Sequence, residues 1–114
     1  MIYYALKKWE LRAIVAGKLA AWNPQEPGHL IDLAYAKRRS EGLHIAHTTL
    51  THAAEVHPAN ATIQFNLACY EAQLGNLDRA KAHLSKATRA DKKFRLLALN
   101  DPDLEPLWSS LSRD

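Results

Sequence analysis

The sequence has only one cysteine, Cys69, and no long run of uncharged apolar residues. A single cysteine cannot form an internal disulfide, which fits a reducing compartment such as the cytosol. Near the start of the chain, Lys7, Lys8, Glu10 and Arg12 interrupt the apolar residues, so we expect neither a signal peptide nor a membrane span there. These absences predict a cytoplasmic protein that does not associate with membranes.

The sequence also lacks the short motifs that carry common enzyme chemistry. It has no glycine-rich phosphate loop, no nucleophile elbow and no paired His-Glu metalloprotease motif. Cys69 follows the small Ala68 on a predicted helix, and we expect it to pack in the core rather than to act as a nucleophile. We therefore predict that the protein is not an enzyme and uses no cofactor.

Six histidines raise the question of a metal site. A zinc site needs three or four ligands that converge at about 2.0–2.3 Å from one point. His44 and His47 share a helix face, but His52 is rotated away from them and Cys69 belongs to another predicted helix. We read the histidines as surface and inter-helix residues and expect no metal.

The chain is mildly basic, with a formal charge of +3 and a pI near 9.1. Basic residues cluster at 37–39 and again between Lys81 and Arg95, but Asp91 stands within the second cluster, and Glu71 and Asp78 precede it. This mixture favours solvated helix faces over a nucleic-acid surface. An acidic protein partner remains compatible with the charge.

Strict apolar–polar alternation is absent, and apolar residues recur at three- and four-residue steps instead, so the predicted fold class is all-α. We expect the first helix to end before Asn23 and the "DKKF" stretch, 91–94, to break the helical pattern. The Asp-Pro pair at 101–102 suits a helix start. The remaining predicted helices resume near Leu30 and cover about 42–56, 61–73, 77–90 and 107–111.

The apolar pattern repeats after 34 residues. Six pairs of identical residues stand at this offset: Leu33 and Leu67, Ala34 and Ala68, Leu43 and Leu77, Ala46 and Ala80, Leu50 and Leu84, Ala53 and Ala87. The small alanines let two antiparallel helices approach closely, and the leucines fill the space beside them. A period of this length with two helices per unit is the tetratricopeptide arrangement.

On these residues the chain resembles a tetratricopeptide-repeat (TPR) protein, with Pro58 as the closing proline and Gly75 as the turn glycine. Gln64 and Glu71 replace the tryptophan and tyrosine that the family pattern has in the second repeat. The resemblance implies an α-solenoid of antiparallel helix pairs within a single domain, 1–114, with a capping helix at each end. The expected segments are a cap over 1–24, repeats over 27–60 and 61–94, and a second cap over 95–114.

In proteins of this family the first helix of each repeat lines a concave surface that holds a peptide or helix of a partner. The resemblance implies that the partner-binding residues here are Tyr35, Arg38, Arg39, Phe65, Asn66 and Gln73. We therefore predict a protein–protein interaction adaptor, with an acidic partner favoured by the arginines. The alternatives are a self-associating, homo-oligomeric repeat unit and a basic RNA-associated module.

Overall fold

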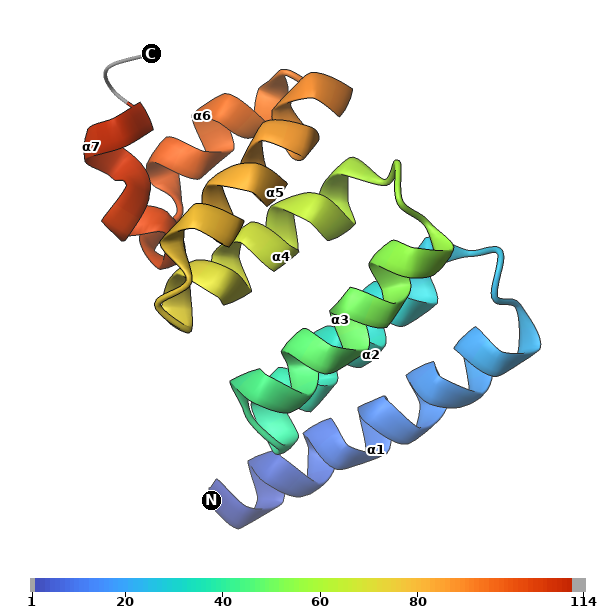
Figure 1. Ribbon diagram of the computed structural model, residues 1–114. Helices are drawn as coiled ribbons and strands as arrows, with labels where there is room; N and C mark the ends of the chain where they lie inside the picture. Colours follow the sequence, from blue (N-terminus) through green and yellow to red (C-terminus); the bar gives the residue numbers. More distant parts are fainter. Residues whose placement is uncertain (1, 112–114) are drawn as a thin grey trace. The chain divides into compact units, whose positions relative to one another are not determined.

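In a computed structural model, the structure describes residues 2–111 and, from residue 8 onward, their side chains (Figure 1). Regular secondary structure within this range is helical throughout, which confirms the all-α prediction. The chain divides between His57 and Pro58 into two compact units. The first contains α1 (Ile2–Trp22), α2 (Pro27–Ser40) and α3 (Leu43–Val56), and the second contains α4 (Ala61–Gln73), α5 (Leu77–Ala90), α6 (Lys93–Asn100), the 3-10 helix η1 (Pro102–Leu107) and α7 (Trp108–Leu111).

The helices repeat at the same interval as the residues. A shift of 34 residues carries the start of α2 onto the start of α4 and both ends of α3 onto both ends of α5. The predicted ranges for α4 and α5 are confirmed to the residue. Ala34 and Ala46 in the first pair, and Ala68 and Ala80 in the second, are completely buried, as a close helix crossing requires.

In the first unit α2 packs between α1 and α3 (Figure 1). The chain enters α2 through Glu26, whose Oε1 accepts a hydrogen bond of 3.0 Å from the backbone N–H of Gly28. Pro27 follows at the first helical position, where a missing N–H costs nothing. On the other side, α1 turns three small buried residues, Ala13, Ala16 and Ala20, toward its neighbour, so its backbone lies close to α2.

The second unit is built on the α4–α5 pair. The side chain of Asn60 accepts a hydrogen bond of 3.0 Å from the backbone N–H of Ile63 and thereby caps α4. The end of the chain packs against this pair, chiefly through η1 on α4. Leu104 and Leu107 on η1 are completely buried there, and the Asp-Pro helix start at 101–102 is confirmed. Positions 112–114 of the predicted cap lie outside the described residues.

The helix α6 was not predicted from the sequence. The predicted break holds at Asp91, whose backbone is extended and whose Oδ1 accepts a hydrogen bond from the backbone N–H of Lys93. A helix then begins at Lys93, inside the stretch expected to be irregular. Only Phe94 and Ala98 are buried on it, and its leucines are exposed, so its apolar residues do not form the single stripe by which a helix is recognised.

The two inter-helix turns differ by one position. Gly75 has a φ of 86°, as expected for the turn glycine between α4 and α5. In the first pair the residue equivalent to Gly75 is Glu41, and the positive φ of 107° falls on Gly42. Glycine is required at both places because a Cβ disfavours this left-handed backbone region. The repeat therefore tolerates a one-residue change in the turn.

Candidate functional site

The six residues predicted to bind a partner fall into two sets, one in each compact unit. Tyr35, Arg38 and Arg39 lie on α2, and the structure brings them together around a hollow of about 390 Å³. The other set, Phe65, Asn66 and Gln73, lies on α4. The two sets make different contacts.

Around Tyr35 the first unit forms a cluster of two arginines and two aromatic rings, called the arginine–aromatic cluster: Trp9, Arg12, Tyr35 and Arg39. The rings of Trp9 and Tyr35 meet edge to face at 5.4 Å. The guanidinium of Arg12 lies 4.7 Å from the Trp9 ring, and that of Arg39 lies 5.4 Å from the Tyr35 ring. Arg39 also donates a hydrogen bond of 3.2 Å from Nη2 to the hydroxyl of Tyr35.

Helix geometry explains this cluster. Trp9 and Arg12 are three residues apart on α1, and Tyr35 and Arg39 are four apart on α2, so each pair shares one helix face. Trp9 and Arg12 were not predicted as members, because the sequence does not fix which residues of α1 meet α2. The three-residue spacing could have predicted that Trp9 and Arg12 lie together, but not that they meet Tyr35.

The cluster is suited to hold a negatively charged group. A guanidinium has five N–H donors in a plane and can bind a carboxylate through two of them. Arg39 uses one donor on Tyr35, and the aromatic rings restrict its position. Tyr35 keeps 43% of its surface exposed, and Arg38 lines the same hollow. The arrangement offers positive charge beside an accessible aromatic ring.

On α4, two of the three predicted residues contact later segments of the same unit. Phe65 is buried against Phe94 of α6, with ring centroids 5.0 Å apart. Gln73 donates a hydrogen bond of 2.9 Å from Nε2 to the backbone carbonyl of Asp103. Asn66 is half-buried. Phe65 and Gln73 therefore help to hold α6 and η1 on this unit.

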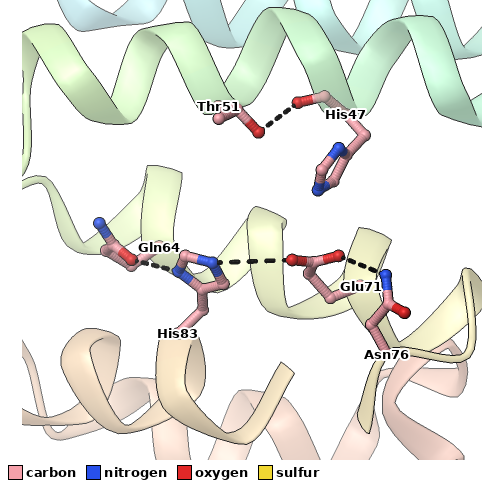
Figure 2. A network of polar contacts seen from close by, with 6 residues as sticks. All are labelled: His47, Thr51, Gln64, Glu71, Asn76 and His83. Carbon is pink, nitrogen blue, oxygen red and sulfur yellow. Dashed lines mark hydrogen bonds and ion pairs between the residues drawn. The ribbon is translucent and has the colours of Figure 1, made fainter. Parts of the chain in front are cut away.

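A polar network lies on the α4–α5 pair (Figure 2). The Nδ1 atom of His83 lies 2.7 Å from Gln64 Oε1, and its Nε2 atom lies 4.0 Å from a carboxylate oxygen of Glu71. Asn76 donates a hydrogen bond of 3.0 Å to the other oxygen of Glu71. Because Gln64 donates through Nε2 to the carbonyl of Pro58, its Oε1 accepts, and His83 must carry a proton on Nδ1.

This network ties together α4, α5 and the turn between them. Gln64 and Glu71 are only 4% and 3% exposed, and burial of such groups is tolerated when they are hydrogen-bonded. They are two of the positions at which the sequence departs from the aromatic residues of the TPR pattern. The partner residue on the facing helix, His83, agrees with the expectation of an inter-helix histidine. We assign the network a structural role.

One group of three potential metal ligands lies within 4.8 Å in the part of the chain that the structure describes: Cys69, Asp101 and Asp103. It contains none of the histidines considered from the sequence. Cys69 donates through Sγ to Asp101 Oδ2 at 3.7 Å. Asp101 Oδ1 accepts a hydrogen bond of 3.0 Å from the backbone N–H of Asp103 and so caps η1. Packing and capping account for these contacts.

No family model, curated protein or solved structure matches this chain.

Proposed function

We propose that the protein is a non-enzymatic, TPR-like adaptor that binds an acidic segment of a partner protein at the hollow formed by Tyr35, Arg38 and Arg39. The TPR-like assignment draws its support from the 34-residue offset, which relates both the residues and the helix bounds of the α2–α3 and α4–α5 pairs. The proposal of an acidic partner is supported by the equivalent face of α4, which contacts an acidic segment of this chain.

The main support comes from α4. Its face equivalent to the Tyr35–Arg39 face of α2 already contacts an acidic segment of the chain. The 34-residue shift makes Tyr35 equivalent to Cys69, and Arg39 equivalent to Gln73. Cys69 and Gln73 bond to Asp101 and to the carbonyl of Asp103, at the start of η1. The α4 face therefore accommodates a short segment rich in aspartate.

On α2 the same face has more positive charge, and it carries a phenol ring where α4 has a thiol. An arginine replaces Gln73, and a partly exposed tyrosine replaces the buried Cys69. A hydrogen bond to a charged group contributes about 1.5–3 kcal/mol, roughly twice that of a neutral pair. The α2 face is thus better suited to aspartate or glutamate than the α4 face that already carries them.

The test is a capture experiment with three forms of the protein. Immobilised parent, the Tyr35→Ala/Arg38→Glu double variant and the Arg89→Glu control are incubated with lysate of the source cells, and captured proteins are identified by mass spectrometry. Arg89 is an exposed arginine on α5, so its replacement matches the charge change of Arg38→Glu away from the hollow.

We expect proteins captured by the parent and the control to be lost from the double variant, with unchanged helicity by circular dichroism. Capture should weaken as salt increases, because charges at a surface are screened. A partner that the double variant retains would contradict the assignment of this hollow.

A further inference from the structure

A hollow of about 250 Å³ lies within the second unit and is lined by residues of α5, α6 and α7. We call it the α5–α7 hollow. Its polar lining consists of two cations and three hydroxyl groups, from Lys81, Ser85, Thr88, Arg95 and Ser110. Its apolar lining consists of Leu84 and Leu111. Among the residues that the structure describes, none of the side chains lining this hollow is acidic.

The helical period of α5 places its share of the lining on one face. Lys81, Ser85 and Thr88 follow one another at steps of four and three residues. Leu84, one turn after Lys81, is buried and supplies apolar surface to the hollow. Arg95 lies on α6, so the fold of this unit, and not the spacing along one helix, brings the two cations to one hollow.

The two cations and two of the hydroxyls keep donors that a ligand can use. Within the described part of the chain, Lys81 and Arg95 form no ion pair, and the hydroxyls of Ser85 and Ser110 donate no hydrogen bond. Thr88 differ from these, because its hydroxyl donates to backbone carbonyls of α5. Ammonium and guanidinium groups have several N–H donors each and accept none, so they favour an anion.

Acidic residues stand near the hollow in the sequence but not in its lining. Asp91 precedes Arg95 by four residues, and its carboxylate is used by Lys93. The Nζ atom of Lys93 lies 3.5 Å from Asp91 Oδ2, and the backbone N–H of Lys93 donates to Oδ1. Asp78 precedes Lys81 by three residues but does not line the hollow. The groups that face a ligand here are therefore cationic, hydroxylic or apolar.

A phosphomonoester matches these groups better than a carboxylate does. A phosphate group carries a charge of about −1.5 to −2 at pH 7 and has three strong acceptor oxygens. Lysine and arginine both bind phosphate, and a serine hydroxyl can donate to a remaining oxygen. A carboxylate has one charge and two oxygens, so it leaves more of the available donors unused. Pockets for drug-sized ligands have volumes of about 300–1,000 Å³, so the ligand of this hollow is small.

We propose that the α5–α7 hollow binds the phosphate group of a small organic phosphomonoester, either a free molecule or a phosphorylated side chain. Lys81, Arg95 and the serine hydroxyls bind the phosphate, and Leu84 and Leu111 contact the organic group. This site is additional to the proposed function, because it lies within the second unit, whereas Tyr35, Arg38 and Arg39 belong to the first.

The probe is phenyl phosphate, which combines the phosphate with a small apolar ring. Three compounds are compared with it: benzoate replaces the phosphate with a carboxylate, inorganic phosphate lacks the ring, and benzyl alcohol lacks the charge. A short phosphotyrosine peptide presents the same group as a side chain. Binding to the isotope-labelled full chain is followed by the NMR shifts of its backbone amides, which also locate the site.

Two double variants with the same net charge accompany the parent. Lys81→Ala/Arg95→Ala removes both cations of the hollow. Lys86→Ala/Arg89→Ala is the matched control, because it removes one exposed lysine and one exposed arginine of α5 that do not line the hollow. Circular dichroism establishes that both variants are folded.

We expect phenyl phosphate to bind the parent saturably, with shifts concentrated at 81–88, 93–97 and 110–111. Benzoate and inorganic phosphate should each bind at least about tenfold more weakly, and Lys81→Ala/Arg95→Ala should weaken phenyl phosphate binding by about tenfold or more. The matched control and Tyr35→Ala/Arg38→Glu should stay within about twofold of the parent. Tighter binding of the peptide than of phenyl phosphate would identify a phosphorylated side chain as the source, and weaker binding a free molecule.

Three results would overturn the proposal. The first is the absence of saturable phenyl phosphate binding to the folded parent. The second is an equal loss of binding in the two double variants, because the effect would then come from net charge rather than from the hollow. The third is benzoate or benzyl alcohol binding as tightly as phenyl phosphate, which would exclude recognition of the phosphate group.

Discussion

The α2 and α4 helices have the same apolar register, but their equivalent faces make different contacts. On α4, Cys69 and Gln73 contact the start of η1, which belongs to the same unit. On α2, Tyr35 and Arg39 stand at the equivalent positions and form a partly exposed cluster with Trp9 of α1. In the second unit a later segment of the same unit therefore occupies this face, whereas in the first unit Tyr35 and Arg39 stay partly accessible.

The interiors of the two helix pairs differ in a similar way. Gln64 and Glu71 of the second pair are buried and form a polar network with the partly buried His83. The equivalent residues of the first pair are Leu30, Lys37 and Thr49. Lys37 makes a partly exposed ion pair of 2.8 Å with Glu41, and Thr49 bonds only to the carbonyl one turn earlier on its own helix.

The positions that the two pairs share define the fold. The alanines and leucines common to both pairs set the helix crossing, because only small residues fit where two helices meet. Positions beside that crossing can be aliphatic, ionic or a hydrogen-bonded network without a change in the helix bounds. Variation at those positions is what gives each pair its own surface.

The largest expected effect concerns the segment that occupies the α4 face. Leu107→Ala should destabilise the protein by about 2–5 kcal/mol, since it removes a completely buried side chain and leaves a cavity. Chemical denaturation followed by circular dichroism measures the change. Leu96→Ala, at an exposed leucine, should change stability by less than about 0.5 kcal/mol. Equal stability of the two variants would mean that η1 does not support α4.

The next effect tests whether the two pairs share one register. Ala46→Leu and Ala80→Leu should each cost about 1–3 kcal/mol, because three extra carbons cannot enter a close helix crossing without displacing the backbone. The melting temperatures of both variants should fall by similar amounts. Ala82→Leu, on an exposed position of α5, is the matched control and should melt like the parent. If Ala80→Leu melted like the parent while Ala46→Leu was destabilised, the two helix pairs would not share one packing register.

An effect of similar size distinguishes the polar contacts of the two helix pairs. His83→Ala removes the donor to Gln64 and a partner of Glu71, both of which are buried. Leaving a buried polar group unsatisfied costs about 1–3 kcal/mol. The equivalent replacement in the first pair, Thr49→Ala, removes only a local bond and should stay within about 0.5 kcal/mol. Similar losses for both, by urea denaturation, would contradict a structural role for the network.

The sequence predicted the helices better than the contacts between them. Helical period and breakers gave the bounds of α4 and α5, because both signals are local along the chain. The missed helix α6 has its apolar residues distributed around its axis, so tertiary contacts at Phe94 and Ala98 hold it rather than an amphipathic stripe.

The candidate site was predicted in part for a similar reason. Tyr35 and Arg39 share a face by their spacing alone, and the structure brings them together. That Trp9 meets Tyr35 depends on how α1 slides along α2, which no local pattern specifies. The use of Gln73 by η1 depends likewise on where a segment about thirty residues later folds back. The single-domain division into caps and repeats stays a prediction.

The smallest expected effect is that of metal ions on the melting temperature. It concerns another difference between the α4 face and the α2 face. Cys69, Asp101 and Asp103 place three potential ligands on the α4 face, whereas the residue equivalent to Cys69 on α2 is Tyr35. Ligation would have to break the bond from Cys69 to Asp101 and the cap that Asp101 makes on η1. We therefore expect zinc and nickel to leave the melting temperature unchanged. A ligand present at 100 times its Kd would stabilise the fold by about 2.7 kcal/mol, which differential scanning fluorimetry detects readily. A rise of that size that disappears in Cys69→Ala would make the α4 face a metal site, because packing and capping alone would then not account for the three ligands.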